Sequence, residues 1–245
     1  MKTLLLKIAR CEEIKKVFSG EESPCKEIVE SQGCGKEYFH VPEPWSGNLK
    51  TAPILFVSSN PSIDKKSEYP KEHWKDDCIA DFFENRFADG KKEWVKDHLY
   101  PLLSDGKHRE KNVRYWKSVR KIACELLKKN ESQIAPGKDY ALTEVVHCKS
   151  RDGKGVKFAR KQCSHKYLKE IIEKSPAKLI ISCGNHAHQA ILDIFFNRIV
   201  DEFRYKDDLE RERIKKSSGK RWFAFIKHPS RYGSNQFQQK EIKKL

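Results

Sequence analysis

The sequence predicts an α/β fold with three layers, in which helices cover both faces of a central four-stranded parallel sheet. Two observations lead to this fold class. Four short apolar runs rich in β-branched residues are spread through the chain, and helical patterns separate them. Short, nearly continuous apolar runs that alternate with helices are typical of parallel strands that are buried on both faces.

Each predicted strand can be read directly from the chain. The strands span residues 53–60 (PILFVSSN), 140–147 (YALTEVVH), 178–184 (KLIISCG) and 222–228 (WFAFIKH). None of these runs approaches the roughly 20 apolar residues that a membrane-spanning helix requires. We therefore expect no integral membrane segment.

Apolar residues at helical spacing predict the connections between the strands. Helices are expected near residues 73–88, 91–104 and 114–129, and in the last of these Val119, Ile122, Ala123, Leu126 and Leu127 recur at helical spacing. Residues 158–175 and 185–198 supply the next two crossovers, and residues 233–244 supply a closing helix.

No strong internal boundary or repeat is visible, so a single domain is expected over residues 1–245. Residues 1–50 form an N-terminal segment that carries cysteines, and residues 42–47 (PEPWSG) form a rigid lead-in to the first strand. Residues 204–221 contain eight basic and four acidic side chains. This stretch is expected to be a helical insertion or a mobile loop.

The chain of 245 residues has a formal net charge of +15, with 50 Lys and Arg against 35 Asp and Glu. Such an excess favours a polyanionic partner, with nucleic acid ahead of an anionic membrane. The first seven residues contain only three consecutive apolar residues, fewer than the roughly 7–15 of a signal peptide. We therefore expect a cytoplasmic protein without a membrane partner.

Eight cysteines are present, and a disulfide framework is not expected because cytosolic thiols are kept reduced. Cys78, Cys124 and Cys183 lie in apolar patterns and are expected to be buried as small hydrophobic residues. The other five lie in polar surroundings and need another explanation; they are Cys11, Cys25, Cys34, Cys148 and Cys163.

Polar side chains capable of chemistry follow all four predicted strands. The strand ends read SSNPS at 58–62, EVVHC at 144–148, CGN at 183–185 and KHPS at 227–230. Ligands of open α/β sheets bind outside the carboxyl ends of the strands. Any one of these ends is compatible with an ordinary turn or helix cap, but four ends at one edge indicate a functional site.

Two of these ends, Asn60-Pro-Ser62 and His228-Pro-Ser230, resemble the paired motifs of the uracil-DNA glycosylase superfamily. The resemblance covers residues 25–235, and the Asn-Pro pair is similar to that of the mismatch-specific and single-strand-selective branches. It implies a uracil-DNA glycosylase-like fold that binds DNA and extrudes a base. It also implies that Asn60 holds the hydrolytic water, that His228 hydrogen-bonds the departing base, and that Tyr69 stacks on that base, with Ser62 beside it.

The residue types suit the cleavage of an N-glycosidic bond. A histidine that donates to the base oxygen stabilises the developing negative charge, and loss of one such donor costs on the order of 10²–10³ in rate. Asparagine orients water but takes its proton poorly, so Asp64 is a candidate for a stronger base. The alternative for His228 is a histidine that only makes a local hydrogen bond. No lysine stands at a motif position, so a monofunctional enzyme without lyase activity is expected.

The cysteines resemble those of the iron–sulfur branch of the same superfamily. Cys148 and Cys163, separated by 14 residues, are similar to its second ligand pair. The resemblance implies a [4Fe–4S] cluster with two upstream ligands, for which Cys25 and Cys34 are the candidates and Cys11 remains eligible. Four thiolates suit structural zinc equally well, and five incidental thiols are the remaining alternative.

Glu144 departs from the resemblance, because the iron–sulfur branch carries an asparagine at this position that recognises uracil. An ionised carboxylate only accepts hydrogen bonds, so it would favour a base with an amino group, such as a modified cytosine. The alternative is that Glu144 pairs with a basic residue and that uracil is the substrate. Because the excised base is open, the biological role is open as well, and it is either repair of damage or defence against modified foreign DNA.

Part of the basic excess is expected to contact DNA phosphates. Residues 149–161 carry six basic side chains, among them Lys149, Arg151, Lys154 and Lys157. Asn185 at a helix start offers backbone N–H groups to a phosphate. Ser230, Arg231 and Tyr232 correspond to the loop that superfamily members insert into the minor groove when a nucleotide is extruded.

The sequence therefore predicts a monomeric DNA glycosylase that hydrolyses the N-glycosidic bond of an extruded base. A different class remains as the alternative: a metal-stapled module that binds nucleic acid without catalysis.

Overall fold

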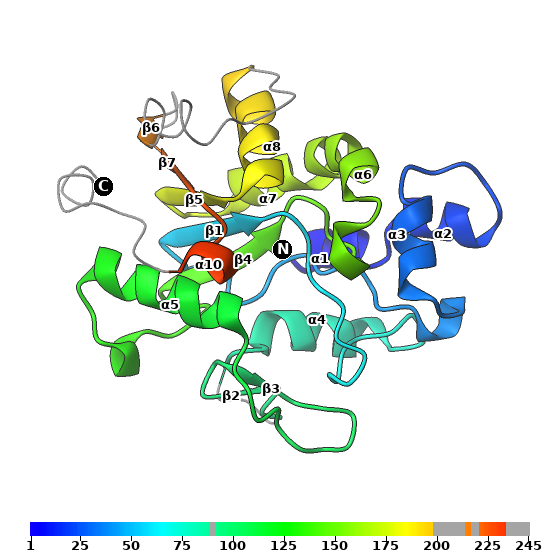
Figure 1. The fold of residues 1–245 in the computed structure, drawn as a ribbon, viewed down its shortest axis with the longest axis horizontal. Coiled ribbons are helices and arrows are strands. Elements are labelled where there is room, and N and C mark those ends of the chain that lie inside the picture. The colour runs from blue at the N-terminus through cyan, green and yellow to red at the C-terminus, as the bar shows by residue number, and fades with distance from the viewer. Residues whose placement is uncertain (89–91, 198–213, 217–220, 234–245) are drawn as a thin grey trace.

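The computed structural model describes residues 1–88, 92–197, 214–216 and 221–233. Its main sheet has the strand order β4-β1-β5-β7-β6 (Figure 1). Strands β1 (Ile54–Ser58), β4 (Tyr140–Glu144), β5 (Leu179–Cys183) and β7 (Trp222–Ile226) are parallel to one another, and β6 (Ile214–Lys216) pairs with β7 in the antiparallel direction. The central four-stranded parallel sheet that the sequence predicts is confirmed.

Strands β1, β4 and β5 are buried along their whole length, as their continuous apolar sequences require. Every residue of β1, β4 and β5 is buried. In the register of the sheet, Ile54 at the start of β1 lies opposite Tyr140 of β4 on one side and Leu179 of β5 on the other. Since both faces are covered, the polar side chains of the sheet that can contact a ligand are those at the ends of its strands.

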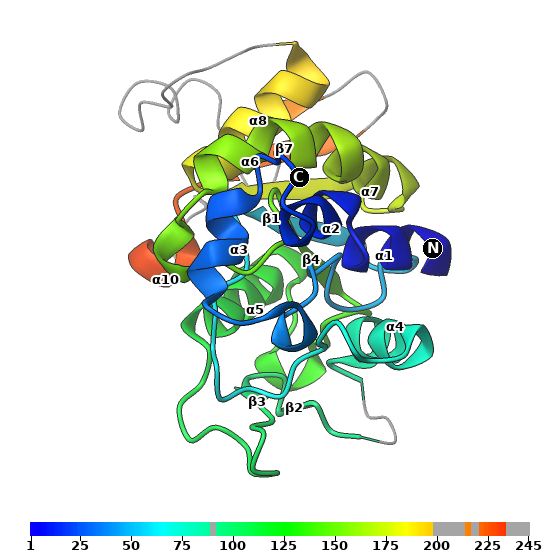
Figure 2. The ribbon, with the colours of Figure 1, turned by 90° about the vertical axis from the view of Figure 1, so that its right-hand side faces the viewer.

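Helices cover both faces of the sheet, which gives the α/β arrangement with three layers (Figures 1 and 2). Helices α4 (Asp76–Asn85) and α5 (Arg114–Leu127) lie on one face, and α6 (Val156–Cys163), α7 (Lys169–Lys174) and α8 (Asn185–Phe196) lie on the other. Helices α6 and α7 are continuous through a π-helical turn at Ser164–Leu168. No helix in the described ranges is both long and apolar enough to cross a membrane.

The N-terminal segment folds into three short helices that pack beside the sheet: α1 (Lys2–Ala9), α2 (Glu12–Phe18) and α3 (Lys26–Gln32). Helix α1 packs on α4, and α3 packs on the 3-10 turn Arg151–Gly153. Two further 3-10 turns lie at Lys36–Tyr38 and Glu131–Gln133. The short helix α10 (Pro229–Tyr232) follows β7 and contacts α5.

Three predictions of secondary structure and burial need correction. The helix expected near 91–104 is wrong, since β2 (Val95–Lys96) and β3 (Tyr100–Pro101) form a hairpin whose turn holds Asp97 and His98 at positive φ. Of the stretch 204–221, residues 204–213 and 217–220 lie outside the described residues, and the helical interpretation is corrected only for the three residues of β6, which are extended. Cys78 is exposed on α4 and is not a core residue. The helix expected at 233–244 lies outside the described residues, except for Gly233.

Candidate functional site

A cavity of about 350 Å³ lies at the carboxyl ends of three parallel strands. Asn60 follows β1 by two residues, Glu144 is the last residue of β4, and His228 follows β7 by two residues. All three line this cavity. Because parallel strands end at the same edge of a sheet, the topology brings together residues that are 84 and 168 positions distant from Asn60 in the sequence.

His228 is held in a fixed position at the N-terminus of α10. It is the residue that precedes the helix, and Pro229 occupies the first helical position. Its Nε2 lies 3.1 Å from the Ser58 hydroxyl, and its ring stacks on Tyr115 with centroids 5.5 Å apart. Burial, with the charge of Arg231 added, lowers the pKa of His228. The imidazole is therefore neutral at pH 7, with one ring N–H to donate.

The amide of Asn60 is oriented by its neighbours. Ser59 donates its hydroxyl to Oδ1 at 3.0 Å, and Nδ2 donates to the carbonyl of Pro61 at 3.1 Å. The carbonyl oxygen of an amide has a second lone pair, so Oδ1 can also accept a hydrogen bond from water. This arrangement suits a residue that positions a water molecule and does not remove its proton.

Asp64 also lines the cavity, but its carboxylate is already engaged. It accepts hydrogen bonds from the backbone N–H of Lys66 at 3.0 Å and the hydroxyl of Ser67 at 2.9 Å, and Arg109 lies 3.6 Å away. Burial alone would raise the pKa of Asp64, but these partners outweigh it and the pKa is lowered. A lowered pKa makes Asp64 a weaker base than its place after the Asn-Pro motif suggests.

Glu144 is 7% exposed, and its Oε2 has no hydrogen-bond partner among the described residues. Burial, followed by the negative charge of Glu43, raises the pKa of Glu144 well above the usual value. Burial and Glu43 therefore favour the protonated carboxyl over the ionised carboxylate that the sequence predicts. A neutral carboxyl offers one O–H donor beside one acceptor.

Glu43 is a second buried carboxyl in the same cavity, and it is not among the predicted site residues. It binds Arg86 at 3.0 Å, and it accepts hydrogen bonds from Ser46 at 2.9 Å and from the Tyr69 hydroxyl at 3.2 Å. Burial would raise the pKa of Glu43, but Arg86, Lys149 and Ser46 outweigh this effect and lower it. Glu43 is thus the ionised member of the carboxyl pair.

The lead-in 42–47 places Glu43 at this position because the lead-in runs beside β4. Ser46 exchanges backbone hydrogen bonds with Leu142, at 2.8 and 3.1 Å, and the backbone N–H of Glu43 donates to the carbonyl of His147 at 2.7 Å. The sequence offers one signal that could have identified Glu43 as a site residue, which is a charged side chain between two prolines in an otherwise apolar segment.

Tyr69 and Lys149 both lie inside the cavity wall and not on an open surface. Tyr69 is 2% exposed, and the Lys149 ammonium lies 4.0 Å from its ring centroid. Lys149 also donates to the carbonyl of Ser62 at 3.0 Å. Tyr69 lines the cavity that would receive the base, and its stacking role stays a prediction. A buried ammonium does not match a surface contact to phosphate, so the role predicted for Lys149 needs correction.

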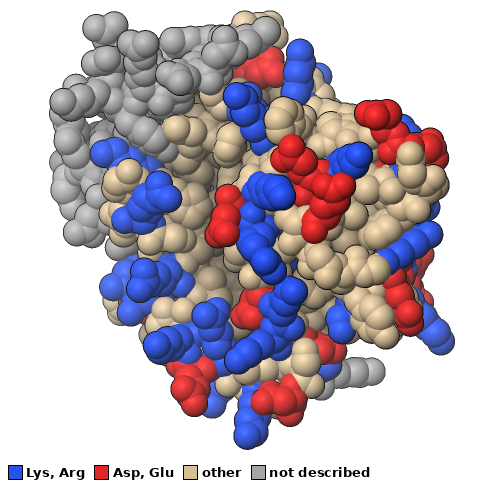
Figure 3. Space-filling view, turned by 45° about the vertical axis from the view of Figure 1, so that its right-hand side comes forward, with Lys and Arg blue, Asp and Glu red and all other residues tan. Residues whose placement is uncertain are grey.

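The remaining basic side chains of the predicted DNA track are at the surface. Arg151 and Lys154 are exposed in a loop whose Ser150 pairs with Ser62 at the cavity rim, and Lys157 is exposed in the first turn of α6. Figure 3 shows Lys and Arg side chains in a band down one face, with acidic side chains among them.

The other predicted DNA contacts differ in their distance from the cavity. Ser230 lines it, and Arg231 and Tyr232 are exposed immediately afterwards in α10. Asn185 is exposed at the start of α8 but does not line the cavity. The structure therefore associates α10, and not the start of α8, with the site.

Four cysteines from distant parts of the chain line a second, small cavity next to the first. They are Cys11, which precedes α2; Cys25, which precedes α3; Cys148, which follows β4; and Cys163, the last residue of α6. Cys34 lines a different hollow, formed by α2 and α3. The structure thus groups Cys11, and not Cys34, with the other three thiols.

The thiols of this cluster interact with one another and are free of disulfides. A hydrogen bond between Cys25 and Cys148 lowers the pKa of the first and raises that of the second. The Tyr167 hydroxyl contacts Cys11 Sγ at 3.2 Å. Within the described ranges, no group of three or more His, Cys, Asp or Glu side chains is arranged to hold a metal ion. The donor types nevertheless fit a thiolate-bound cluster or zinc.

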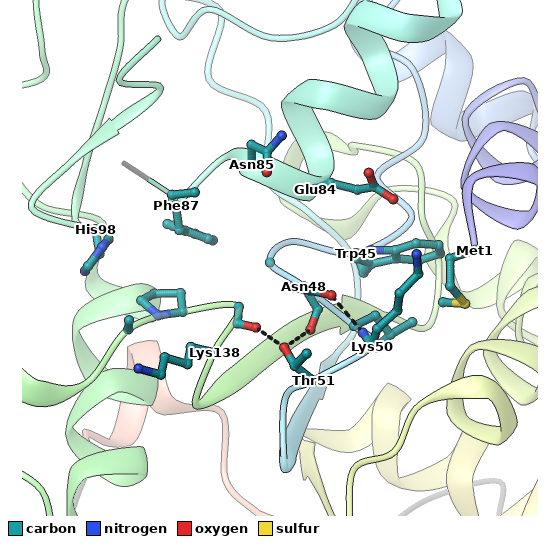
Figure 4. A pocket seen from close by; sticks show the side chains of 16 residues that line it. Met1, Trp45, Asn48, Lys50, Thr51, Glu84, Asn85, Phe87, His98 and Lys138 are labelled. Atoms are coloured by element: carbon teal, nitrogen blue, oxygen red, sulfur yellow. Dashed lines mark hydrogen bonds between the residues drawn. The ribbon is translucent and has the colours of Figure 1, made fainter. Parts of the chain in front are cut away.

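A further hollow lies at the opposite edge of the sheet, near the amino ends of β1 and β4 (Figure 4). Asn48, Lys50 and Lys138 are among its lining residues, and the Thr51 hydroxyl donates to the carbonyl of Gly137 at 3.0 Å. Ligand sites of open α/β sheets lie at the carboxyl ends, so this hollow is not the candidate site.

Comparison with known proteins adds no assignment: no protein-family model and no curated protein sequence matches the chain.

Proposed function

We propose that the protein is a DNA glycosylase that binds an extruded pyrimidine in the cavity at the carboxyl ends of the strands and hydrolyses its N-glycosidic bond. The observation that carries this proposal is the convergence of Asn60, Glu144 and His228, from three separate strands, on one cavity of about 350 Å³. Small-molecule sites have volumes from about 300 Å³ upward, so a single base can enter.

The reaction requires two forms of assistance, which Asn60 and His228 can supply. The neutral imidazole of His228 donates its N–H to the base oxygen as negative charge develops there. The Oδ1 atom of Asn60 accepts a hydrogen bond from the water that attacks the sugar carbon. Ser58 and Tyr115 hold the imidazole, and Ser59 holds the amide, so neither group has to reorganise during the reaction.

DNA is the partner that the surface favours. The exposed side chains of Arg151 and Lys154 lie in the loop that pairs with the cavity rim, and the exposed Lys157 follows in the first turn of α6. Arg231 and Tyr232 are exposed in α10, the helix that begins directly after His228. Phosphates bound by these groups would bring a flipped nucleotide to the cavity.

A metal or iron–sulfur group on the four thiols would serve as a structural clamp. Cys11, Cys25, Cys148 and Cys163 would hold it, and they link the N-terminal helices to the segment between the second strand and α6. When bound, such a group would supply a fixed scaffold and no step of the hydrolysis. The basic loop begins directly after Cys148, so the clamp would fix its position.

The proposed function is tested by single-turnover assays of abasic-site formation on duplexes with uracil or modified cytosines. The Asn60→Ala and His228→Ala variants are expected to lose on the order of 10²–10³ in rate. Asn85→Ala and His73→Ala, both exposed and outside the cavity, are the matched controls and should retain the wild-type rate. Salt-sensitive DNA binding without any abasic product would instead identify a non-catalytic binding module.

A further inference from the structure

The Glu144 carboxyl is a buried polar group that has one oxygen without a partner. The residue is 7% exposed, Oε2 has no hydrogen-bond partner among the described residues, and the side chain lines the same cavity as Asn60 and His228. An unsatisfied buried oxygen costs about 1–3 kcal/mol, and a native protein tolerates it where a ligand supplies the partner. The oxygen therefore indicates a contact with a bound molecule.

The groups around Glu144 favour its neutral form. The ionised Glu43 faces it with a negative charge, while Lys149 and the Ser58 hydroxyl act in the opposite direction. Tyr115 and Cys183 also lie near, and burial raises the pKa of both, so neither brings a charge. Burial and Glu43 outweigh Lys149 and Ser58, so the pKa of Glu144 is raised. These groups therefore favour the form of the carboxyl that carries a proton.

The Ser58 hydroxyl connects this carboxyl with His228. It lies 3.1 Å from His228 Nε2 and within hydrogen-bond reach of the Glu144 carboxyl. The two proposed base contacts are therefore close together in space, although they belong to β4 and to the segment after β7. A pyrimidine whose O2 faces His228 can present its N3 and the substituent at C4 to Glu144.

A neutral carboxyl matches the edge of cytosine in a way that permits proton transfer. The carboxyl O–H can donate to N3, which has a free lone pair in cytosine, and the carboxyl C=O can accept from the amino group at C4. In uracil, N3 already carries a hydrogen and cannot take the proton. Cytosine is the poorer leaving group as an anion, so it gains more from protonation.

We propose that Glu144 is the general acid that protonates N3 of an extruded cytosine-type base. The inference rests on the proposed glycosylase function. The O–H bond of Glu144 breaks and an N3–H bond forms, which leaves a carboxylate beside a cationic base. The electrons of the C1′–N1 bond then pass to the base, which departs as a neutral molecule. Water adds to C1′ and releases one proton, which restores the neutral carboxyl of Glu144.

The test compares Glu144→Gln with wild type on duplexes that differ only in the target base: uracil, cytosine, 5-methylcytosine or 5-hydroxymethylcytosine. Glutamine retains the donor and acceptor of the neutral acid, but it has no proton to transfer. We expect wild type to release at least one cytosine-type base, and we expect Glu144→Gln to lower the ratio of its rate to the uracil rate by about 10²-fold or more. Glu84→Gln, which lines the hollow of Figure 4, is the control and should keep the wild-type ratio.

The pH dependence of the wild-type enzyme gives a second readout. Release of the cytosine-type base should fall as pH rises through the pKa of Glu144, because the acid form is lost. Three results would overturn the inference and leave the glycosylase proposal standing: release of uracil alone, an unchanged ratio in Glu144→Gln, or a rate for the cytosine-type base that does not fall at high pH. Failure to release any base would refute the proposed function itself.

Discussion

Single residues decide the chemistry of the two cavities, and their partners determine what each can do. Glu43 and Glu144 are both buried carboxyls in one cavity, yet Arg86 at 3.0 Å keeps the first ionised, while the second has no cation as close among the described residues. Two like charges at short range are costly in a buried site, so ionisation of Glu43 opposes that of Glu144. A titration of this pair would show two apparent pKa values that belong to the pair.

The structure groups Cys11, in place of the predicted Cys34, with the other three thiols, and this leads to a prediction about metal content. Cys11→Ser removes one of the four thiols that share a cavity, so iron or zinc per chain and any visible absorption should fall well below the wild-type level. Cys34→Ser alters a thiol outside that cavity and should retain the wild-type content. Elemental analysis and absorption spectra of anaerobic preparations measure both. A decrease in Cys34→Ser with none in Cys11→Ser would contradict the assignment.

The positions of the site residues are predictable where they directly follow an apolar run. Asn60, Glu144 and His228 can be found because the hydrophobic pattern ends beside them, and parallel strands end at one edge. Glu43 and Arg86 cannot be found in this way, since their roles arise from tertiary contacts between segments 43 positions apart. The charge state of Glu144 likewise depends on burial and on Glu43, which no local pattern reveals.

At the scale of elements, the loop after the second strand depends on a close approach to the N-terminal segment. Gly155 has a φ of +77°, and a Cβ atom there would lie 2.8 Å from the Ile28 side chain and 2.9 Å from the Ile28 backbone nitrogen. Helix α3 therefore supports the loop that carries Arg151 and Lys154. The strands are predictable from their continuous apolar sequence, but the hairpin β2-β3 is not, because its turn depends on positive φ at Asp97 and His98.

Gly155→Ala should destabilise the protein by more than Gly153→Ala. Both glycines have positive φ, and alanine in that conformation costs on the order of 1–2 kcal/mol. A Cβ atom at Gly153 would have no neighbour within 4 Å among the described residues, whereas one at Gly155 would meet Ile28, so a further decrease in stability is expected. Urea unfolding of the two variants and wild type measures the difference. Equal free energies of unfolding in both variants would show that the close approach contributes nothing.

At the scale of the whole molecule, the basic side chains behind the net charge of +15 differ in burial and in their place relative to the cavity. Lys149 is buried in the cavity wall, whereas Arg151, Lys154 and Lys157 are exposed near its rim. At the opposite edge of the sheet, Lys50, Lys138 and Lys178 are also exposed. Of these two exposed sets, the first lies where a nucleotide could reach both phosphate contacts and the cavity.

Replacing Arg151, Lys154 and Lys157 together by alanine should weaken DNA binding and reduce its salt dependence. Removal of one phosphate-binding side chain makes the slope of log Kobs against log salt less negative by about 0.9. The slope should therefore change by up to about 3 units, as measured by fluorescence anisotropy over a salt series. The matched triple variant at Lys50, Lys138 and Lys178 should keep the wild-type slope. Equal changes in the two triple variants would mean that binding follows net charge and not this surface.

The central claim is that the cavity bounded by Asn60, Glu144 and His228 cleaves an N-glycosidic bond. Its most direct test is mass-spectrometric identification of the free base released from the duplex panel by wild type and by His228→Ala. We expect one released pyrimidine, an abasic site in its place, and a rate on the order of 10²–10³ lower in the variant. Absence of any free base, or equal rates for the two proteins, would contradict the claim.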